Sequence, residues 1–125
     1  MKKKGVTKHI YIVIDDGLGI FDFRDKRIVN LFVTSRHANI TMFVMLQQLT
    51  GFCSGAIRNN VDYMFINKIS DHSNIECLYK MTAVQDSVNN MKLYINKNCA
   101  NYNTIFLNMS SINSPEPLIF NANNI

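Results

Sequence analysis

Two long apolar runs in the first half of the chain predict strands buried on both faces. The first, from Ile10 to Ile14, ends directly in Asp15 and Asp16. The second, from Ile40 to Leu46, stops at two glutamines, the second of which is Gln48. Continuous apolar sequence, as opposed to an alternating pattern, is typical of strands in a parallel sheet that is covered on both sides. Polar side chains therefore follow two neighbouring buried strands.

The remaining sequence predicts helices and shorter strands. Asp22 is placed to cap a first helix and Asp71 a second, and Thr82 with Gln85 gives a capping-box pattern for a third. Shorter apolar runs predict strands over Val61–Ile66, Thr104–Leu107 and Leu118–Phe120. Strands that alternate with helices indicate the α/β class, with a mainly parallel sheet and flanking helices on its faces. We find no internal repeat or linker, so residues 1–125 are expected to form a single domain.

Composition and charge favour a folded, soluble protein with no membrane span. The chain has 125 residues, 47% hydrophobic content and a net charge of +4. Its basic residues are spread out, and Met1–Lys4 is the only compact cluster, which we interpret as a solvated terminus. Large side chains within the apolar runs are assigned to the core, not to a base-stacking platform: Phe43, Met45, Phe65 and Phe106. Neither the distribution of basic residues nor the large apolar side chains predict nucleic-acid binding.

The cysteines and histidines do not predict a metal site of their own. Cys53, Cys77 and Cys99 are an odd set without C-x-x-C spacing, which argues against a disulfide framework or a zinc knuckle. A reducing compartment fits this set best. His37, the histidine nearest the predicted site residues, is remote in sequence from the other two histidines. A histidine cluster that binds a metal is therefore not expected.

The acids at the end of the first strand are the most informative feature for function. Parallel strands that end at one edge of a sheet bring their following residues together, so Asp15, Asp16 and Gln48 are expected to lie close to one another. Paired carboxylates in this position are suited to a metal-bound phosphate. Adjacent side chains on a regular strand point to opposite faces, so the strand must end or kink at the acids. Gly17 and Gly19 would allow that turn.

Motifs in the first half of the chain occur in a fixed order. They are Ile10–Asp16, Ser35-Arg36-His37, the strand ending in Gln48, and Ile57–Tyr63. Together they resemble the DNA-packaging ATPases of large double-stranded DNA viruses, the poxvirus and phycodnavirus type in the FtsK/HerA branch of P-loop NTPases. The resemblance covers roughly Ile10 to Ile66 and implies a partial P-loop NTPase core of the RecA/FtsK-like kind. Ser35 departs from the family, which has glycine at that position.

The resemblance implies a role for each matching residue. Asp15 would hold Mg²⁺ through water, Asp16 would polarise the attacking water, and Gln48 would sense the γ-phosphate of ATP. Arg36 and Arg58 are alternative candidates for a finger that reaches the nucleotide of a neighbouring subunit. ATP and Mg²⁺ are thus the implied cofactors, and a homo-oligomeric ring is the implied assembly.

One family motif is missing from this sequence. The family binds ATP through G-x-x-x-x-G-K-[ST], upstream of the acidic strand, whereas no Gly-Lys pair occurs in this chain. The chain therefore resembles the C-terminal part of a P-loop NTPase domain that starts just before the Walker B strand, and it should be inactive alone. The implied partners are an upstream P-loop half, double-stranded DNA, and capsid or portal proteins, in the host cytoplasm, a viral factory or the virion. Sheet faces built for a larger domain are expected to leave an exposed apolar patch.

Three other classes of protein share parts of this sequence pattern. A receiver domain also begins with a strand ending in two acids, but Asp62 begins its strand, whereas a phosphoacceptor would end it, and no Lys-Pro follows Leu107. A noncatalytic interaction domain that keeps the ATPase scaffold remains open, and the missing P-loop supports it. A dinucleotide-binding domain does not fit, because Gly17-Leu18-Gly19 follows the acids and lacks the third glycine.

Overall fold

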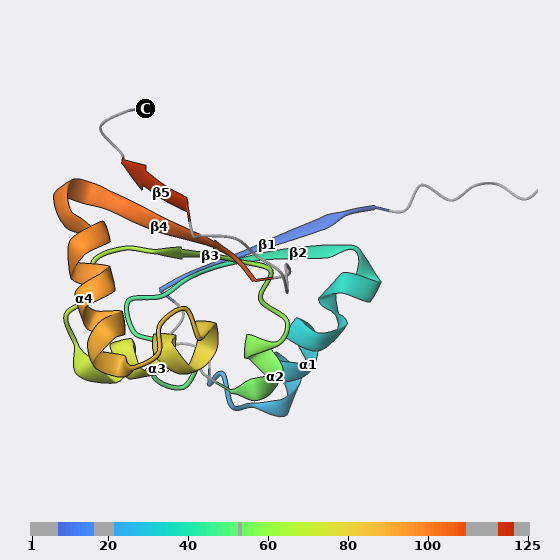
Figure 1. The fold of residues 1–125 in the computed structure, drawn as a ribbon. Helices are drawn as coiled ribbons and strands as arrows, with labels where there is room; N and C mark the ends of the chain where they lie inside the picture. Colours follow the sequence, from blue (N-terminus) through green and yellow to red (C-terminus); the bar gives the residue numbers. More distant parts are fainter. Residues whose placement is uncertain (1–7, 17–21, 53, 110–117, 122–125) are drawn as a thin grey trace, which may run out of the picture. The chain divides into compact units, whose positions relative to one another are not determined.

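The computed structural model describes residues 8–16, 22–52, 54–109 and 118–121 (Figure 1). The chain forms two compact units, Met1–Asn60 and Val61–Ile125. The first unit contains β1 (Ile10–Asp15), α1 (Lys26–Thr34), the 3₁₀ helix η2 (Ser35–Ala38), β2 (Ile40–Met45) and α2 (Gly55–Arg58). The second contains β3 (Tyr63–Ile66), α3 (His72–Thr82), α4 (Val88–Asn98), the 3₁₀ helix η3 (Ala100–Tyr102), β4 (Asn103–Asn108) and β5 (Leu118–Asn121).

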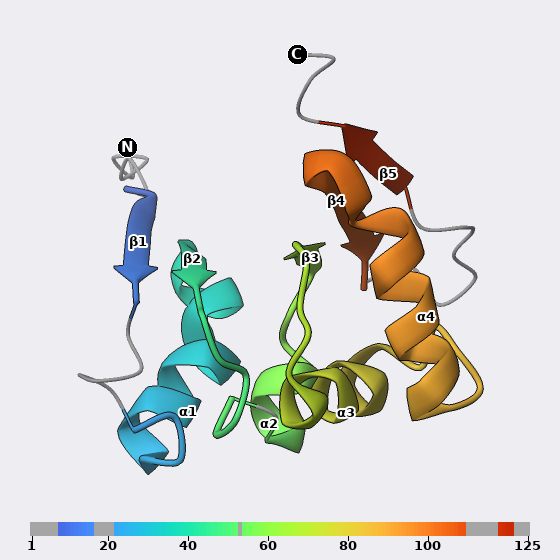
Figure 2. The same ribbon diagram turned by 90° about the vertical axis from the view of Figure 1, so that its left-hand side faces the viewer.

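In the first unit, β1 and β2 pair in parallel, as their apolar sequences predict. The register runs from Ile10 opposite Ile40 to Asp15 opposite Met45. Parallel strands need a crossover connection, which α1 and η2 supply here. Figures 1 and 2 show α1 on one side of the two strands, and α2 packs beside α1.

An aromatic cluster forms the core beneath β1 and β2. Phe23, Phe32 and Phe52, the ring trio, are 2–5% exposed, and each ring meets the other two edge to face. The ring centroids are 5.1–6.3 Å apart. Phe32 lies on α1, whereas the other two come from the segments before α1 and after β2. Ile57 on α2 is fully buried in the same unit.

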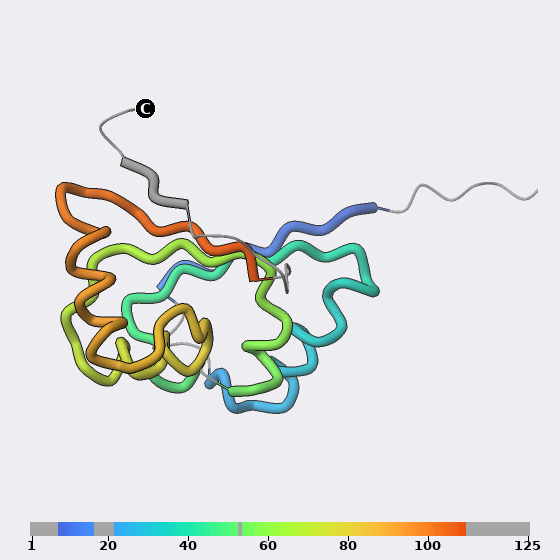
Figure 3. Tube along the Cα trace, in the orientation of Figure 1, coloured from blue at the N-terminus to red at the C-terminus, as the bar shows by residue number. Residues whose placement is uncertain are grey.

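In the second unit the strands are antiparallel, so the prediction of a mainly parallel sheet is wrong for this half. The strand order is β3-β4-β5, and Ile66 at the end of β3 lies opposite Ile105 near the start of β4. Two helices join these strands, and the trace in Figure 3 returns to the end of the sheet where β3 finishes. A single crossover helix would have returned the chain to the other end and made the pair parallel.

The second core lies between this sheet and its two helices. Its fully buried side chains come from α3, α4 and β4: Ile75, Leu78, Met91, Ile95 and Ile105. Figures 1 and 2 show α3 and α4 on one side of β3 and β4. Cys99 is a buried free thiol whose Sγ lies 3.4 Å from the carbonyl oxygen of Ile66. Cys77 is disulfide-bonded, so the expectation of reduced cysteines is wrong at that residue.

The helix starts were predicted with mixed success. Asp71 caps α3 as predicted, accepting a hydrogen bond from the Asn74 backbone N–H. Asp25, three residues beyond the predicted Asp22, caps α1. Ser87 caps α4, because Thr82 is still inside α3, so the capping-box prediction is wrong. The short helix α2 was not predicted from the sequence.

In both units the helices cover one face of the strands and leave large apolar side chains exposed on the other. On β1 and β2 these side chains, which we call the open face, are Tyr11, Val13, Phe43 and Met45, with exposed fractions of 68%, 63%, 53% and 50%. On β3, Tyr63 and Phe65 are also exposed, and both rings contact the ring of Phe106. The expected apolar patch is therefore present. The assignment of Phe43, Met45 and Phe65 to the core is wrong, because the described helices cover only one side.

Among the described residues, no helix has the length and apolar character to cross a membrane.

Candidate functional site

The two acids lie where β1 ends. Asp15 is the last residue of the strand and lies opposite Met45, the last residue of β2. The backbone N–H of Asp16 donates a further hydrogen bond, of 3.2 Å, to the carbonyl of Met45. Both acids are exposed. The edge at which β1 and β2 end, which we call the carboxyl edge, therefore presents two adjacent carboxylates to solvent.

The backbone turns at Asp16 itself. Its φ is +50°, in the left-handed region that aspartate and asparagine tolerate better than most residues. The predicted end or kink of the strand at the acids is therefore present, and it separates Asp16 from the regular alternation of side chains. Gly17 and Gly19, which the sequence suggested for this turn, lie outside the described residues.

Gln48 lies three positions after the last residue of β2 and is exposed. Because β1 and β2 run in parallel, the end of β2 and the end of β1 share the carboxyl edge. Gln48 thus follows a strand that ends beside Asp15, and not one that ends at the opposite edge. Gln47 is exposed as well, so exposure does not distinguish the two amides.

Arg36 belongs to the opposite edge of the parallel pair. It lies in η2, immediately before β2, and the start of β1 is tied to this connection by a 2.9 Å hydrogen bond from the Ile10 N–H to the Asn39 carbonyl. Six strand residues of about 3.3 Å each separate this edge from the carboxyl edge. That length exceeds the reach of an arginine side chain, so Arg36 does not meet the acids of its own chain.

Arg58 is the last residue of α2, whose first turn is capped by the Ser54 hydroxyl at 3.3 Å from the Ile57 nitrogen. Its side chain is half-buried, unlike that of Arg36, which is exposed. The structure therefore places the two finger candidates in different surroundings. His37 is exposed next to Arg36, while His9 contacts the Thr41 hydroxyl at 2.8 Å.

Asp15 and Asp16 are the exposed carboxylates of the carboxyl edge that could contribute to a metal site. In the part of the chain that the structure describes, no three His, Cys, Asp or Glu side chains gather into a metal site. Magnesium bound with a nucleotide needs fewer protein ligands, because phosphate oxygens and water fill most of its octahedral shell. The exposed carboxylates of Asp15 and Asp16 are suitable groups for such an ion.

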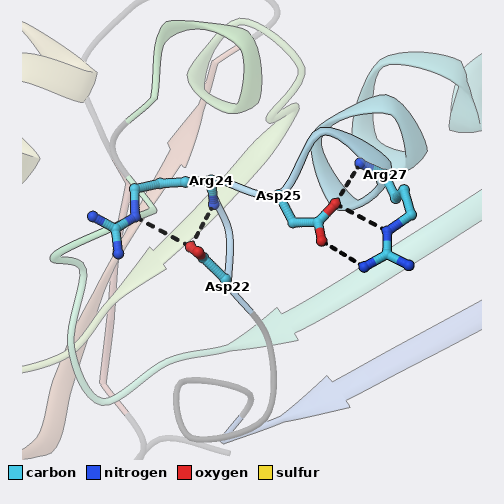
Figure 4. A network of polar contacts seen from close by, with 4 residues as sticks. All are labelled: Asp22, Arg24, Asp25 and Arg27. Carbon is cyan, nitrogen blue, oxygen red and sulfur yellow. Dashed lines mark hydrogen bonds and ion pairs between the residues drawn. The ribbon is translucent and has the colours of Figure 1, made fainter.

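Sequence reasoning missed a polar network before α1, which Figure 4 shows. Asp22 accepts hydrogen bonds from the backbone and the side chain of Arg24, at 2.9 and 3.2 Å. Asp25 likewise accepts hydrogen bonds from the backbone and the side chain of Arg27. Its second carboxylate oxygen accepts a further hydrogen bond from Nη2 of Arg27, at 2.7 Å. The repeated Asp-x-Arg spacing was the available signal. Phe23 of the ring trio lies between Asp22 and Arg24 in the first of these pairs.

These contacts lower the pKa of Asp25 to about 2, chiefly through the hydrogen bond from the Arg27 side chain and then the bond from the Arg27 backbone. The unfolded chain titrates this group near its ordinary value of 3.8. A carboxyl whose folded pKa is lower stabilises the fold above the unfolded pKa, and this contribution is lost as the pH falls towards the folded pKa.

We therefore predict that the first unit loses stability between about pH 4 and pH 2, and that Asp25→Asn weakens this dependence. The measurement is the urea midpoint of unfolding, followed by circular dichroism across this pH range. Arg27→Gln, which removes the main donor, should act in the same direction, whereas Lys92→Gln on α4 should not. An unchanged slope in Asp25→Asn would show that this carboxyl does not contribute.

Comparison with protein-family models matches residues 1–116 to a family described as Poxvirus A32 protein. The match includes both strands of the parallel pair and the carboxyl edge. The comparisons found no significant match among curated proteins or among solved structures.

Proposed function

Because the chain belongs to the poxvirus A32 family of viral packaging ATPases, we propose that it is part of an ATPase that drives double-stranded DNA into a capsid. The family match agrees with the resemblance predicted from the motifs. The observation that carries the proposal is the carboxyl edge, where a parallel pair of strands presents Asp15 and Asp16 side by side. An enzyme of the FtsK/HerA branch would use this edge to hydrolyse ATP.

Each group at the carboxyl edge has a proposed task in that reaction. Asp15 would hold Mg²⁺ through a water molecule, and the ion would neutralise charge on the phosphates of ATP. Asp16, displaced from the strand by its left-handed backbone, would accept a proton from the water that attacks the γ-phosphorus. Gln48 would donate a hydrogen bond to the γ-phosphate from beyond the neighbouring strand.

The position of Arg36 supports a role on a neighbouring subunit. It precedes β2 at the edge opposite the acids, so it would reach a nucleotide only in another copy of the chain. A guanidinium in that place would stabilise negative charge in the transition state. We propose a homo-oligomeric ring on this basis, with Arg58 as the alternative finger.

The proposal requires a phosphate-binding loop from elsewhere, because this sequence has no Gly-Lys pair. Without the loop, no backbone cradle or lysine holds the β- and γ-phosphates. We therefore propose that an upstream P-loop half completes the enzyme and that this chain alone is inactive. Capsid or portal proteins would be the further partners of the motor, in a viral factory, the host cytoplasm or the virion.

The test is ATP hydrolysis by the chain joined to the P-loop half of a full-length member of the family. The joined protein is expected to release phosphate in a reaction that needs Mg²⁺, and the 125-residue chain alone is expected to release none. Replacing the P-loop lysine by alanine in the joined protein controls for contaminating ATPases. A joined protein that binds ATP but releases no phosphate, with or without DNA, would contradict the proposal.

A noncatalytic role is the second candidate, and the missing Gly-Lys pair specifically favours it. The chain would then keep the ATPase scaffold as an interaction domain. The same experiment separates the two functions, since a noncatalytic domain would remain without turnover after it is joined to a functional P-loop half.

A further inference from the structure

The fold gathers basic side chains that are far apart in the sequence. Lys8 and His9 directly precede β1, and Arg36 and His37 belong to η2, directly before β2. Because the two strands are parallel, these four residues lie at the edge where both strands begin, which we call the amino edge. All four side chains are exposed. The amino edge therefore presents a cluster of basic side chains to solvent.

Local contacts hold the two segments of this edge together. The backbone N–H of Ile10 donates a 2.9 Å hydrogen bond to the carbonyl of Asn39, which joins the start of β1 to the end of η2. The Nε2 atom of His9 lies 2.8 Å from the Oγ1 atom of Thr41 on β2. The centroid of the His9 ring is also 4.8 Å from that of Tyr11. The basic side chains are thus carried by neighbouring, hydrogen-bonded segments.

The acidic residues of the first unit follow the opposite edge. Residues 1–60 contain nine lysines and arginines but only four acids, and all four acids lie between Asp15 and Asp25. That segment begins at the carboxyl edge and precedes α1. Residues 61–125 contain four basic and five acidic residues, so the excess of positive charge belongs to the first unit. No carboxylate of the same unit cancels the positive charge at the amino edge.

These side chains suit the phosphodiester backbone of a nucleic acid. Lysine and arginine bind backbone phosphates and contribute affinity without reading the base sequence. Because the side chains are exposed at the edge of a sheet, they fit an extended polyanion better than a small anion, which is usually bound in a concave site. A protein that moves along DNA needs contacts that do not depend on sequence.

We propose that the amino edge contacts the backbone phosphates of double-stranded DNA, with Lys8 as a charged contact and His37 as a hydrogen-bond donor. The inference rests on the proposed function and adds the surface through which the chain holds the DNA. Arg36 lies on the same edge. It is left unchanged in the test because it is also a finger candidate.

The test measures binding of the full 125-residue chain to a short fluorescent DNA duplex, by fluorescence anisotropy at several salt concentrations. Lys8→Glu is expected to weaken binding by about tenfold. It should also reduce the slope of log K against log salt by about one, because a lysine on a phosphate releases about one counterion. His37→Ala should weaken binding by a smaller factor. The control is Lys92→Glu, which makes the same change in net charge at an exposed position of α4.

The possible outcomes separate the DNA-binding surface from the enzymatic function. Equal losses in Lys8→Glu and Lys92→Glu would assign the attraction to net charge and overturn the inference, as would an unaltered chain that does not bind the duplex at low salt. The measurement needs neither ATP nor the P-loop half, so either result leaves ATP hydrolysis by the joined protein untouched. DNA binding through Lys8, without turnover in the joined protein, would support the amino edge and contradict the ATPase. Circular dichroism of each variant verifies that it is folded.

Discussion

In the ATPase completed by its P-loop half, Asp16→Asn is expected to lower the rate of ATP hydrolysis by about two orders of magnitude or more. An amide cannot accept the proton of the attacking water, so the variant loses the general base. Binding of ATP should survive, because Asp15 and the P-loop groups that hold the nucleotide are unchanged. The effect should therefore appear in kcat, with little change in the affinity for ATP.

Asparagine is the appropriate replacement because it matches aspartate in shape and in backbone preference. Asp16 has a φ of +50°, a region in which asparagine is also tolerated, so the substitution adds little strain. Asp22→Asn is the control, since Asp22 is an exposed carboxylate of the same unit that contacts only the turn before α1 in the network of Figure 4. Unchanged turnover in Asp16→Asn would remove this residue from the mechanism.

The strands were predictable because their information is local. An apolar run bounded by polar residues indicates a strand wherever it lies, and β1 extends by only one residue beyond the predicted Ile10–Ile14. The predicted strand from Val61 to Ile66 and the observed β3 end at the same residue. The cap at Asp71 is equally local, since the carboxylate bonds a backbone N–H three residues later.

The arrangement of the sheets was less predictable because it depends on what lies between and beyond the strands. An apolar run has the same sequence whether its second face is covered by the chain itself or by a partner. Phe43 and Phe65 were therefore assigned to a core that the described residues do not provide. The antiparallel pairing of β3 and β4 depends on the two intervening helices, and strand periodicity does not encode it.

The candidate site shows the same division between local and distant information. The acids at the strand end follow directly from the sequence, and the parallel register sets the end of β2 beside Asp15. The contacts of Phe23 with Phe52 join segments on either side of β2, and no short motif signals them. Arg36 and Arg58 were equivalent candidates in the sequence, because only the fold shows that Arg36 precedes β2 at the edge opposite the acids.

The largest effect on stability is expected for Phe52→Ala in the ring trio. Phe52 is 5% exposed, and its ring centroid lies 5.1 Å from that of Phe23 and 5.6 Å from that of Phe32. Removing a buried phenyl ring costs the free energy of its transfer from water and leaves a cavity, which together amount to about 3–5 kcal/mol. Edge-to-face contacts contribute about 0.5–1.5 kcal/mol per pair to such clusters. A loss of this size is a large share of the roughly 5–15 kcal/mol that stabilises a typical domain.

Phe43→Ala is the matched control, because it makes the same chemical change at a side chain that is 53% exposed on the open face. Its expected cost is below about 1 kcal/mol, as for substitutions outside a core. Both variants are compared by urea unfolding at low protein concentration, so that association through the open face does not stabilise either one. Phe52 also ties the segment after Gln48 through a 2.9 Å bond from its N–H to the Leu49 carbonyl. If Phe52→Ala and Phe43→Ala lowered the free energy of unfolding equally, the open face would be buried in solution. The ring trio would then not be the dominant core of the first unit.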